Sequence, residues 1–261
     1  MSLDRKINRI QFLSGNSLKV IAVLTMLIDH LCKIVLQWLL SNYWGAMADN
    51  GQMSWERFRE IDYFIRFDLQ SIGTIAFPLF CFLLAEGFQH TRSKKRYIGL
   101  MLAFALISEV PFDIGFFNAY SRMEGTFPFY LKYQNVFFTL FLGLLTLVCL
   151  ERFSCKSDLP VDRIKSAVLQ VLSVVLFSGI AEGIHCDYGM QGILFISAFY
   201  ICRNHRIYQV LLFLLAYMGT TGNQPPLCTL LACLLILLYN GKRGNCLLYT
   251  SPSPRDRSVS R

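Results

Sequence analysis

Two ionisable side chains stand together inside a long apolar stretch near the start of the chain. Asp29 and His30 interrupt a hydrophobic run that extends from Leu18 to Leu40. The hydrocarbon core of a bilayer takes roughly 20 apolar residues as a helix, so this run is long enough to cross it. An ionisable group at that depth costs about 2.5 to 3.5 kcal/mol on insertion scales and marks a functional site by default. A histidine placed there predicts general-base or nucleophilic chemistry.

A carboxylate is expected at the same depth in another apolar stretch. Glu109 follows Tyr97 by twelve residues, as His30 follows Leu18. Twelve residues of α-helix rise about 18 Å, which places both side chains near the middle of the bilayer. If the two helices are neighbours, the carboxylate of Glu109 orients the imidazole of His30 and raises its basicity. We therefore take His30, Asp29 and Glu109 as the candidate catalytic residues.

Further polar residues lie within or beside the apolar stretches and are candidates for the same site. They are Glu86, Ser108, Asp113, Gln134, Asn135 and Asp187. Pro111 predicts a kink that would open a polar cavity near Ser108.

Structural roles remain open for several of these residues. Asp29 is one helical turn from Lys33 and can pair with it, and His30 can be a neutral hydrogen-bonding group between helices. Glu86 can pair with Arg92, Gln134 and Asn135 can cap a helix, and Asp187 can belong to a surface turn.

The composition predicts an all-α, polytopic membrane protein. Of 261 residues, 54% are hydrophobic and 16% are charged, and the mean hydropathy is +0.44. Such a chain has more apolar residues than a soluble core of this size takes up. We expect about eight transmembrane helices, near residues 18–40, 70–88, 97–117, 134–150, 167–183, 189–202, 207–219 and 227–239. They form one membrane domain, 18–240, between an N-terminal segment, 1–17, and a polar tail, 241–261.

The basic residues predict the orientation of these helices. The net charge of +8 is divided into short clusters between apolar runs, which argues against a nucleic-acid-binding surface. Alternate connections hold most of the Lys and Arg, so the positive-inside rule places both ends of the domain in the cytoplasm. The expected location is the cytoplasmic membrane of a bacterium.

Cysteine and histidine give no sign of a metal site. The nine cysteines include no C-x-x-C pair, and His30, His90, His185 and His205 lack the spacing of metal ligands. We expect no metal and no disulfide.

Short motifs in a fixed order resemble the TraX family. They are LKVIAVLTMLIDH at 18–30, IAFPLF at 75–80, AEGFQHT at 85–91, ISEVPFD at 107–113, QNVFFTL at 134–140, DYG at 187–189 and YNGKRG at 239–244. The first motif is also distantly similar to membrane acyltransferase-3 proteins. The resemblance implies an acetyltransferase that uses acetyl-CoA, as in the pilin acetylation linked to conjugation, with His30 as the essential histidine.

The resemblance also raises the question of where the donor and acceptor bind. A basic segment at the cytoplasmic end would attract the phosphates of acetyl-CoA; the candidates are Lys19, Arg92, Lys94, Lys95 and Arg96. The acceptor is an amine or hydroxyl, such as a pilin N-terminus or a glycan. Two other functions remain open, a proton-coupled transporter and a non-catalytic component of a conjugation or secretion apparatus. The low-complexity tail after Gly244 departs from the family pattern and predicts a truncated or non-native end.

Overall fold

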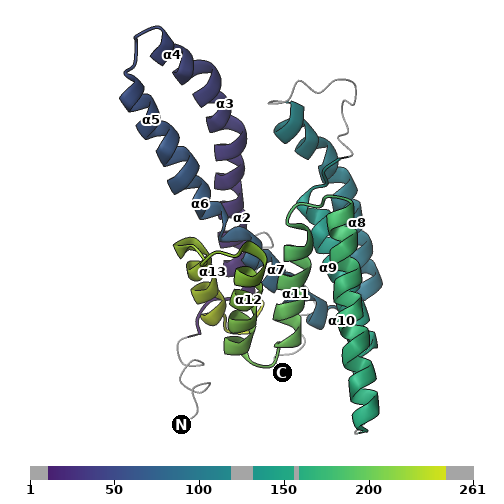
Figure 1. Ribbon diagram of the computed structural model, residues 1–261. Coiled ribbons are helices and arrows are strands. Elements are labelled where there is room, and N and C mark those ends of the chain that lie inside the picture. Colours follow the sequence, from purple (N-terminus) through teal and green to yellow (C-terminus); the bar gives the residue numbers. More distant parts are fainter. Residues whose placement is uncertain (1–10, 119–131, 156–158, 245–261) are drawn as a thin grey trace, which may run out of the picture.

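The computed structural model describes residues 11–118, 132–155 and 159–244, and these are folded as a bundle of helices (Figure 1). Two isolated backbone bridges are the nearest approach to a β-sheet in these ranges. The prediction of an all-α fold is therefore confirmed for the described residues. Most of the predicted tail lies outside them.

The first helix is much longer than the predicted first span. α2 (Gly15–His30) begins after Ser14, whose hydroxyl accepts a hydrogen bond from the backbone N–H of Ser17. It continues without a break through η1 (Leu31–Leu36), α3 (Gln37–Leu39), η2 (Leu40–Trp44) and α4 (Gly45–Asp49). The two η segments are π-helical turns, which occur often at functional sites. At 1.5 Å per residue the 35-residue helix is about 52 Å long, longer than a bilayer core is thick.

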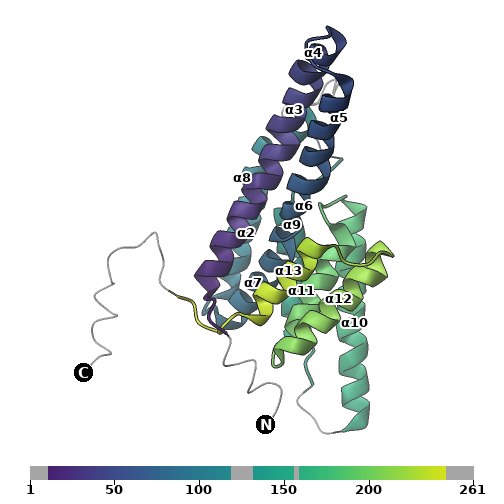
Figure 2. The same cartoon turned by 90° about the vertical axis from the view of Figure 1, so that its left-hand side faces the viewer.

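A second long helix returns beside the first. It consists of α5 (Trp55–Tyr63), η3 (Phe64–Leu69), α6 (Gln70–Gly73) and, after a turn at Thr74 and Ile75, α7 (Ala76–His90). The hairpin formed by α3, α4 and α5 stands away from the other helices (Figures 1 and 2). Hydropathy did not predict the helices of this hairpin between residues 40 and 70, because acidic and basic residues interrupt the apolar run there.

The remaining helices alternate in direction (Figure 1). They are α8 (Lys94–Asp113) with η4 (Ile114–Asn118), α9 (Val136–Arg152), α10 (Pro160–Gly183), α11 (Gly189–Ile201), α12 (Arg206–Thr221) and α13 (Leu227–Leu237). α8 continues through Pro111 and changes to π-helical turns at Ile114. We call the end of the bundle that holds Arg92 to Arg96 the basic end.

Some of the described helices have the length of a membrane span, whereas the apolar helices Gly189–Ile201 and Leu227–Leu237 are shorter. Among the described residues, four helices are long and apolar enough to cross a membrane: Gly15–Asp49, Trp55–His90, Lys94–Phe116 and Pro160–Gly183. Each of the eight predicted spans overlaps a helix. Many large apolar side chains on α2, α8 and α10 are exposed, including Leu24, Ile107 and Val171. Such a surface suits contact with lipid chains.

The half of the bundle near the basic end holds the core. Buried aromatic rings from α7, α11 and α12 meet there: Phe82, Phe88, Phe195, Phe199 and Phe213. At the same end, the segment after α13 pairs with the segment before α2. The backbone N–H of Leu13 donates to the carbonyl of Leu238, and that of Gly15 donates to the carbonyl of Lys242. The first and last helices are thereby joined.

Candidate functional site

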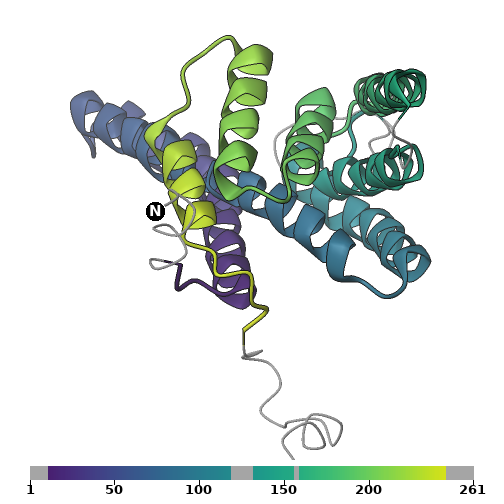
Figure 3. The same cartoon turned by 90° about the horizontal axis from the view of Figure 1, so that it is seen from below.

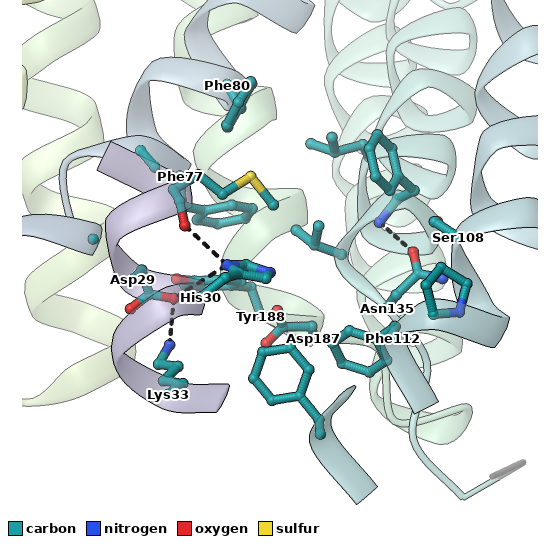
Figure 4. A pocket seen from close by; sticks show the side chains of 18 of the residues that line it. Asp29, His30, Lys33, Phe77, Phe80, Ser108, Phe112, Asn135, Asp187 and Tyr188 are labelled. Carbon is teal, nitrogen blue, oxygen red and sulfur yellow. Dashed lines mark hydrogen bonds and ion pairs between the residues drawn. The ribbon is translucent and has the colours of Figure 1, made fainter. Parts of the chain in front are cut away.

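A cavity of about 600 Å³ lies in the half of the bundle away from the basic end. Five parts of the chain enclose it: α2 with η1, the α6–α7 turn, the end of α8 with η4, the start of α9, and the connection between α10 and α11. Its apolar wall includes Phe77, Phe80, Phe112, Phe116, Phe137 and Tyr188. The polar groups on its wall are Asp29, His30, Lys33, Ser108, Tyr133, Asn135 and Asp187 (Figure 4).

His30 is held with one ring nitrogen available to the cavity. Its Nδ1 lies 3.0 Å from the backbone carbonyl oxygen of Met26. A carbonyl oxygen only accepts hydrogen bonds, so Nδ1 carries the proton and Nε2 carries the lone pair. Nε2 has no hydrogen-bond partner in the described ranges, and the ring contacts Phe116 edge-on at a centroid distance of 5.3 Å. This tautomer is the one that a general base facing the cavity requires.

Asp29 stands between His30 and Lys33. Its Oδ2 is 2.8 Å from Nζ of Lys33 and 3.6 Å from Nδ1 of His30. The predicted pairing of Asp29 with Lys33 is thus present. Asp29 also contacts Gly73 at the end of α6, where a Cβ atom would lie 2.5 Å from the carboxylate oxygen. Glycine is needed here so that the returning helix can approach Asp29.

Asp187 is fixed in the cavity wall by three hydrogen bonds. Its Oδ1 accepts a hydrogen bond of 3.0 Å from the hydroxyl of Tyr133. Its backbone N–H donates to the carbonyl of Gln134 at 2.8 Å, and its carbonyl accepts from the hydroxyl of Thr139. Burial raises the pKa of the Asp187 carboxyl, although the hydroxyl of Tyr133 and the charge of Lys33 act in the opposite direction. Asp187 is therefore part of the cavity wall and is held rigidly.

The backbone on both sides of Asp187 is strained. His185 and Tyr188 have φ values of 52° and 63°, in the left-handed region that residues with a side chain seldom adopt. Such conformations cost on the order of 1 to 3 kcal/mol and persist where the surroundings enforce them. The ring of Tyr188 stacks on Phe77 with 3.6 Å between centroids and 12° between planes. This stacking joins the connection to α7.

Glu109 does not pair with His30, so that prediction is wrong. Its Oε2 accepts hydrogen bonds from the backbone N–H of Asn135, at 3.2 Å, and from the side-chain amide of Asn135. Glu109 is on the side of α8 that packs against α9, together with the buried Asp113, and neither lines the cavity. Ser108 does line it, although its hydroxyl is bonded to the carbonyl of Phe104 at 2.6 Å.

The predicted capping role is correct for Asn135 but not for Gln134. The side-chain oxygen of Asn135 accepts from the backbone N–H of Phe137 at the start of α9. Gln134 instead bridges to the α10–α11 connection through its backbone, donating to the carbonyl of His185 at 3.0 Å. This bridge places Asp187 beside Tyr133.

Glu86 belongs to a separate cluster near the basic end. It pairs with Arg206 at 3.2 Å and lies 3.9 Å from His90, so the alternative pairing with Arg92 is wrong. The guanidinium of Arg206 also lies over the rings of Phe82 and Tyr239.

The predicted donor-binding residues do not reach the cavity. Lys19 is exposed on the first turns of α2, and Lys94 pairs with Glu151 at the end of α9. Neither they nor Arg92, Lys95 and Arg96 line the cavity wall. Pro111 follows Lys94 by 17 positions on α8, which is a rise of about 26 Å. In the described residues, no group of three or more His, Cys, Asp or Glu is arranged to hold a metal ion.

The residues that sequence reasoning missed are Tyr133, Tyr188 and Lys33 as parts of the cavity wall. The DYG motif contained a signal for the position of Tyr188, since Asp and Gly are typical turn residues. The pairing of Tyr133 with Asp187 depends on a contact across 54 positions of the chain, which spacing alone does not reveal.

The fold and the site define an α-helical membrane protein with a histidine-containing cavity in its apolar region. The chain belongs to the family described as TraX protein, whose family model matches residues 14–250. It is 29% identical over 210 residues to the probable fimbrial assembly protein FimC, serogroup H1, of Dichelobacter nodosus. That match covers 79% of this chain and 69% of the relative. No solved structure matches the chain.

Proposed function

We propose that this protein is an integral membrane acyltransferase of the bacterial cytoplasmic membrane. It would transfer an acetyl group from acetyl-CoA to an amine or hydroxyl acceptor, such as a pilin N-terminus or a glycan. The observation that carries the proposal is the tautomer of His30, which directs the lone pair of Nε2 into a cavity of about 600 Å³. Membership of the TraX family supports it, and the fimbrial-assembly name of the relative fits a pilin acceptor.

The reaction follows from the position of His30. Nε2 takes a proton from the acceptor while the acceptor nitrogen or oxygen attacks the thioester carbonyl carbon. The C–S bond of the resulting tetrahedral intermediate breaks, and the thiolate of CoA takes the proton from the imidazolium. Asp29 stabilises the imidazolium from 3.6 Å, and the ammonium of Lys33 brings positive charge to the wall where an oxyanion forms. Attack by His30 itself, through an acetyl-histidine, uses the same nitrogen.

A donor at the basic end would have to reach about 26 Å along α8 to His30's cavity. The intervening part of the bundle is filled by buried side chains such as Phe82, Phe88 and Leu147. Binding of acetyl-CoA near Arg92 to Arg96 therefore needs a conformational opening of this packed region. The cavity itself has room for the acetyl group, the acceptor end and the thioester.

The test is transfer of radiolabelled acetyl groups by the purified protein in lipid nanodiscs. We expect His30→Ala to lower transfer by about 10² to 10⁴, the usual contribution of a general base. The matched control is His205→Ala, because His205 is exposed in the α11–α12 connection at the basic end. Equal rates for His30→Ala and wild type would overturn the proposal, as would loss of transfer in both histidine variants.

A second candidate is a structural role in assembly of a surface fibre. The relative's name and one feature of the fold favour it. The continuous helix Gly15–Asp49 is longer than the bilayer core, so the hairpin that it forms with α5 would extend beyond the core by about 20 Å. Shortening this hairpin at its tip would abolish assembly but spare acetyl transfer if the projection is an assembly contact.

A further inference from the structure

We propose that a chain embedded in the bilayer enters the cavity sideways between α2 and α8, and that Asp187 binds the protonated amino group at its end. The inference deepens the proposed function, on which it rests, by naming the route and the chemical class of the acceptor. It assigns a role in recognition to Asp187, which the sequence places only among the general candidates for the site.

The first step is the arrangement of the walls. α2 packs on α6 and α7, whereas α8 packs on α9. The two helices stand apart in Figures 1 and 3, with α7 between them, and they approach each other chiefly through η1 and η4. Figure 4 shows the side chains of α2 on one side of the cavity and those of α8 and α9 on the other. The cavity is therefore bounded laterally by two helices that are held apart.

The second step is the surroundings of that gap. The flanking side chains that face outward are large and apolar, with exposed fractions of 53% for Leu27 on α2 and 70% for Ile107 on α8. His30 lies twelve residues, about 18 Å, beyond Leu18, which is within a 30 Å hydrocarbon core. Lipid chains, rather than water, therefore cover the gap. A chain already dissolved in the bilayer reaches the cavity without crossing a polar layer.

The third step is the charge inside the cavity. The carboxylate of Asp29 is neutralised by Lys33 at 2.8 Å. Asp187 has the neutral hydroxyl of Tyr133 as its partner and no ion-pair partner within the described ranges. A carboxylate without a direct ion pair thus faces a mostly apolar cavity. Such a site favours a cation carried on an apolar chain, because a bound cation offsets the cost of the desolvated carboxylate.

The chemistry is consistent with His30 as base. The bound ammonium loses one proton to Nε2 of His30, and the neutral amine that forms attacks the thioester carbon. When the C–S bond breaks, the amine proton passes to the thiolate, giving an amide and CoA. The imidazolium then releases its proton to water. Asp187 makes no bond in this sequence and is a positioning residue.

The experiment measures binding without acyl transfer. Nanodiscs containing the protein are photolabelled with a decylamine that carries a diazirine, and with its N-acetyl derivative, which has the same chain and no charge. We expect labelling of the cavity peptides by the amine to exceed that by the neutral probe about tenfold or more. Dodecylamine should compete with the label, whereas butylamine, which prefers water, should not.

Variants locate the effect. Asp187→Asn should remove the preference for the amine, while Asp49→Asn, at the exposed tip of the hairpin, should leave it unchanged. Equal labelling by the charged and neutral probes in wild type overturns the role of Asp187 even if the variant does not fold. Competition by butylamine as strong as by dodecylamine overturns the lateral route.

The outcome also separates this inference from the proposed function. Charge-selective labelling that depends on Asp187, in a protein that transfers no acetyl group, would leave the subsite standing and remove the acyltransferase. Acetyl transfer that depends on His30, with labelling indifferent to charge, would remove the subsite and keep the enzyme.

Discussion

Adding one methyl group at Gly73 should disturb the site through Asp29. A Cβ atom at this position would lie 2.5 Å from both Cβ and Oδ1 of Asp29 and 2.6 Å from its Cγ. All three distances are below 3.0 Å, and Cβ of Asp29 is attached directly to the backbone, so rotation of the side chain does not relieve the overlap. Either α2 or α6 must shift.

The magnitude follows from the cost of overpacking, about 1 to 3 kcal/mol for an added group in a well-packed region. Gly73→Ala should lower the free energy of unfolding by that amount. In a helix without such an overlap, replacing glycine by alanine normally raises the free energy of unfolding by about 0.5 to 1 kcal/mol. Gly99→Ala is the matched control, because Gly99 is also helical, on α8, and a Cβ there meets no atom within 4 Å. The control variant should be slightly more stable than wild type.

Unfolding in mixed micelles on titration with SDS measures both variants. Acetyl transfer provides a second readout, since displacement of Asp29 moves the carboxylate that supports His30. Equal stability of Gly73→Ala and Gly99→Ala would refute the packing that we derive for Asp29. Normal transfer in a destabilised Gly73→Ala would show that Asp29 is needed for structure alone.

Three other perturbations have expected outcomes. Arg206→Met should lower the free energy of unfolding in SDS titration by about 3 to 5 kcal/mol, because it leaves Glu86 buried without its partner. Adding Glu86→Gln to this variant should restore most of the lost stability. No recovery in the double variant would count against the ion pair. Asn135→Ala should lower the free energy of unfolding by about 1 to 3 kcal/mol in the same assay, because the Glu109 carboxylate loses its side-chain donor. Unchanged stability would contradict this hydrogen bond between Asn135 and Glu109. The raised pKa of Asp187 predicts a pH dependence, because its carboxylate is ionised only above that pKa. Binding of decyltrimethylammonium, whose charge is fixed, should be lost as the pH falls through a value above the ordinary carboxyl pKa of about 4. Asp187→Asn should not show this pH-dependent loss of binding.

The sequence predicted the positions of the helices well because hydropathy is a local property. Each predicted span overlaps a helix, and His30 lines a cavity. The charged hairpin was missed for the same reason, since its charged residues interrupt the apolar run on which hydropathy depends. Hydropathy reports which segments are in lipid, and it does not report where a helix ends.

The wrong partner for His30 shows what depth arithmetic leaves out. Glu109 and His30 were placed at one height, but height does not give the direction in which a side chain points. Ala105, Glu109 and Asp113 are spaced by four residues and share one face of α8, which is buried against its neighbours. Ser108 and Phe112 belong to the face that lines the cavity. The i, i+4 spacing was present in the sequence, but which face turns toward α2 depends on contacts between distant helices.

The two halves of the bundle differ in a way that bears on the proposed acetyl transfer. Near the basic end, aromatic rings and the pair of Arg206 with Glu86 fill the interior, and the backbone pairing of Leu13 with Leu238 joins the first helix to the last. Away from that end, α2 and α8 enclose an open cavity. The α6–α7 turn at Thr74 and Ile75 lies at the boundary between the packed half and the half with the cavity. The second helix is interrupted there, because the backbone N–H groups of Thr74 and Ile75 donate to carbonyls three residues earlier, as in a short turn. Bending at this turn would move the packed part of α7 away from α2 while the contact of Gly73 with Asp29 stayed in place. A donor from the basic end could then approach His30 without disturbing the residues that hold it.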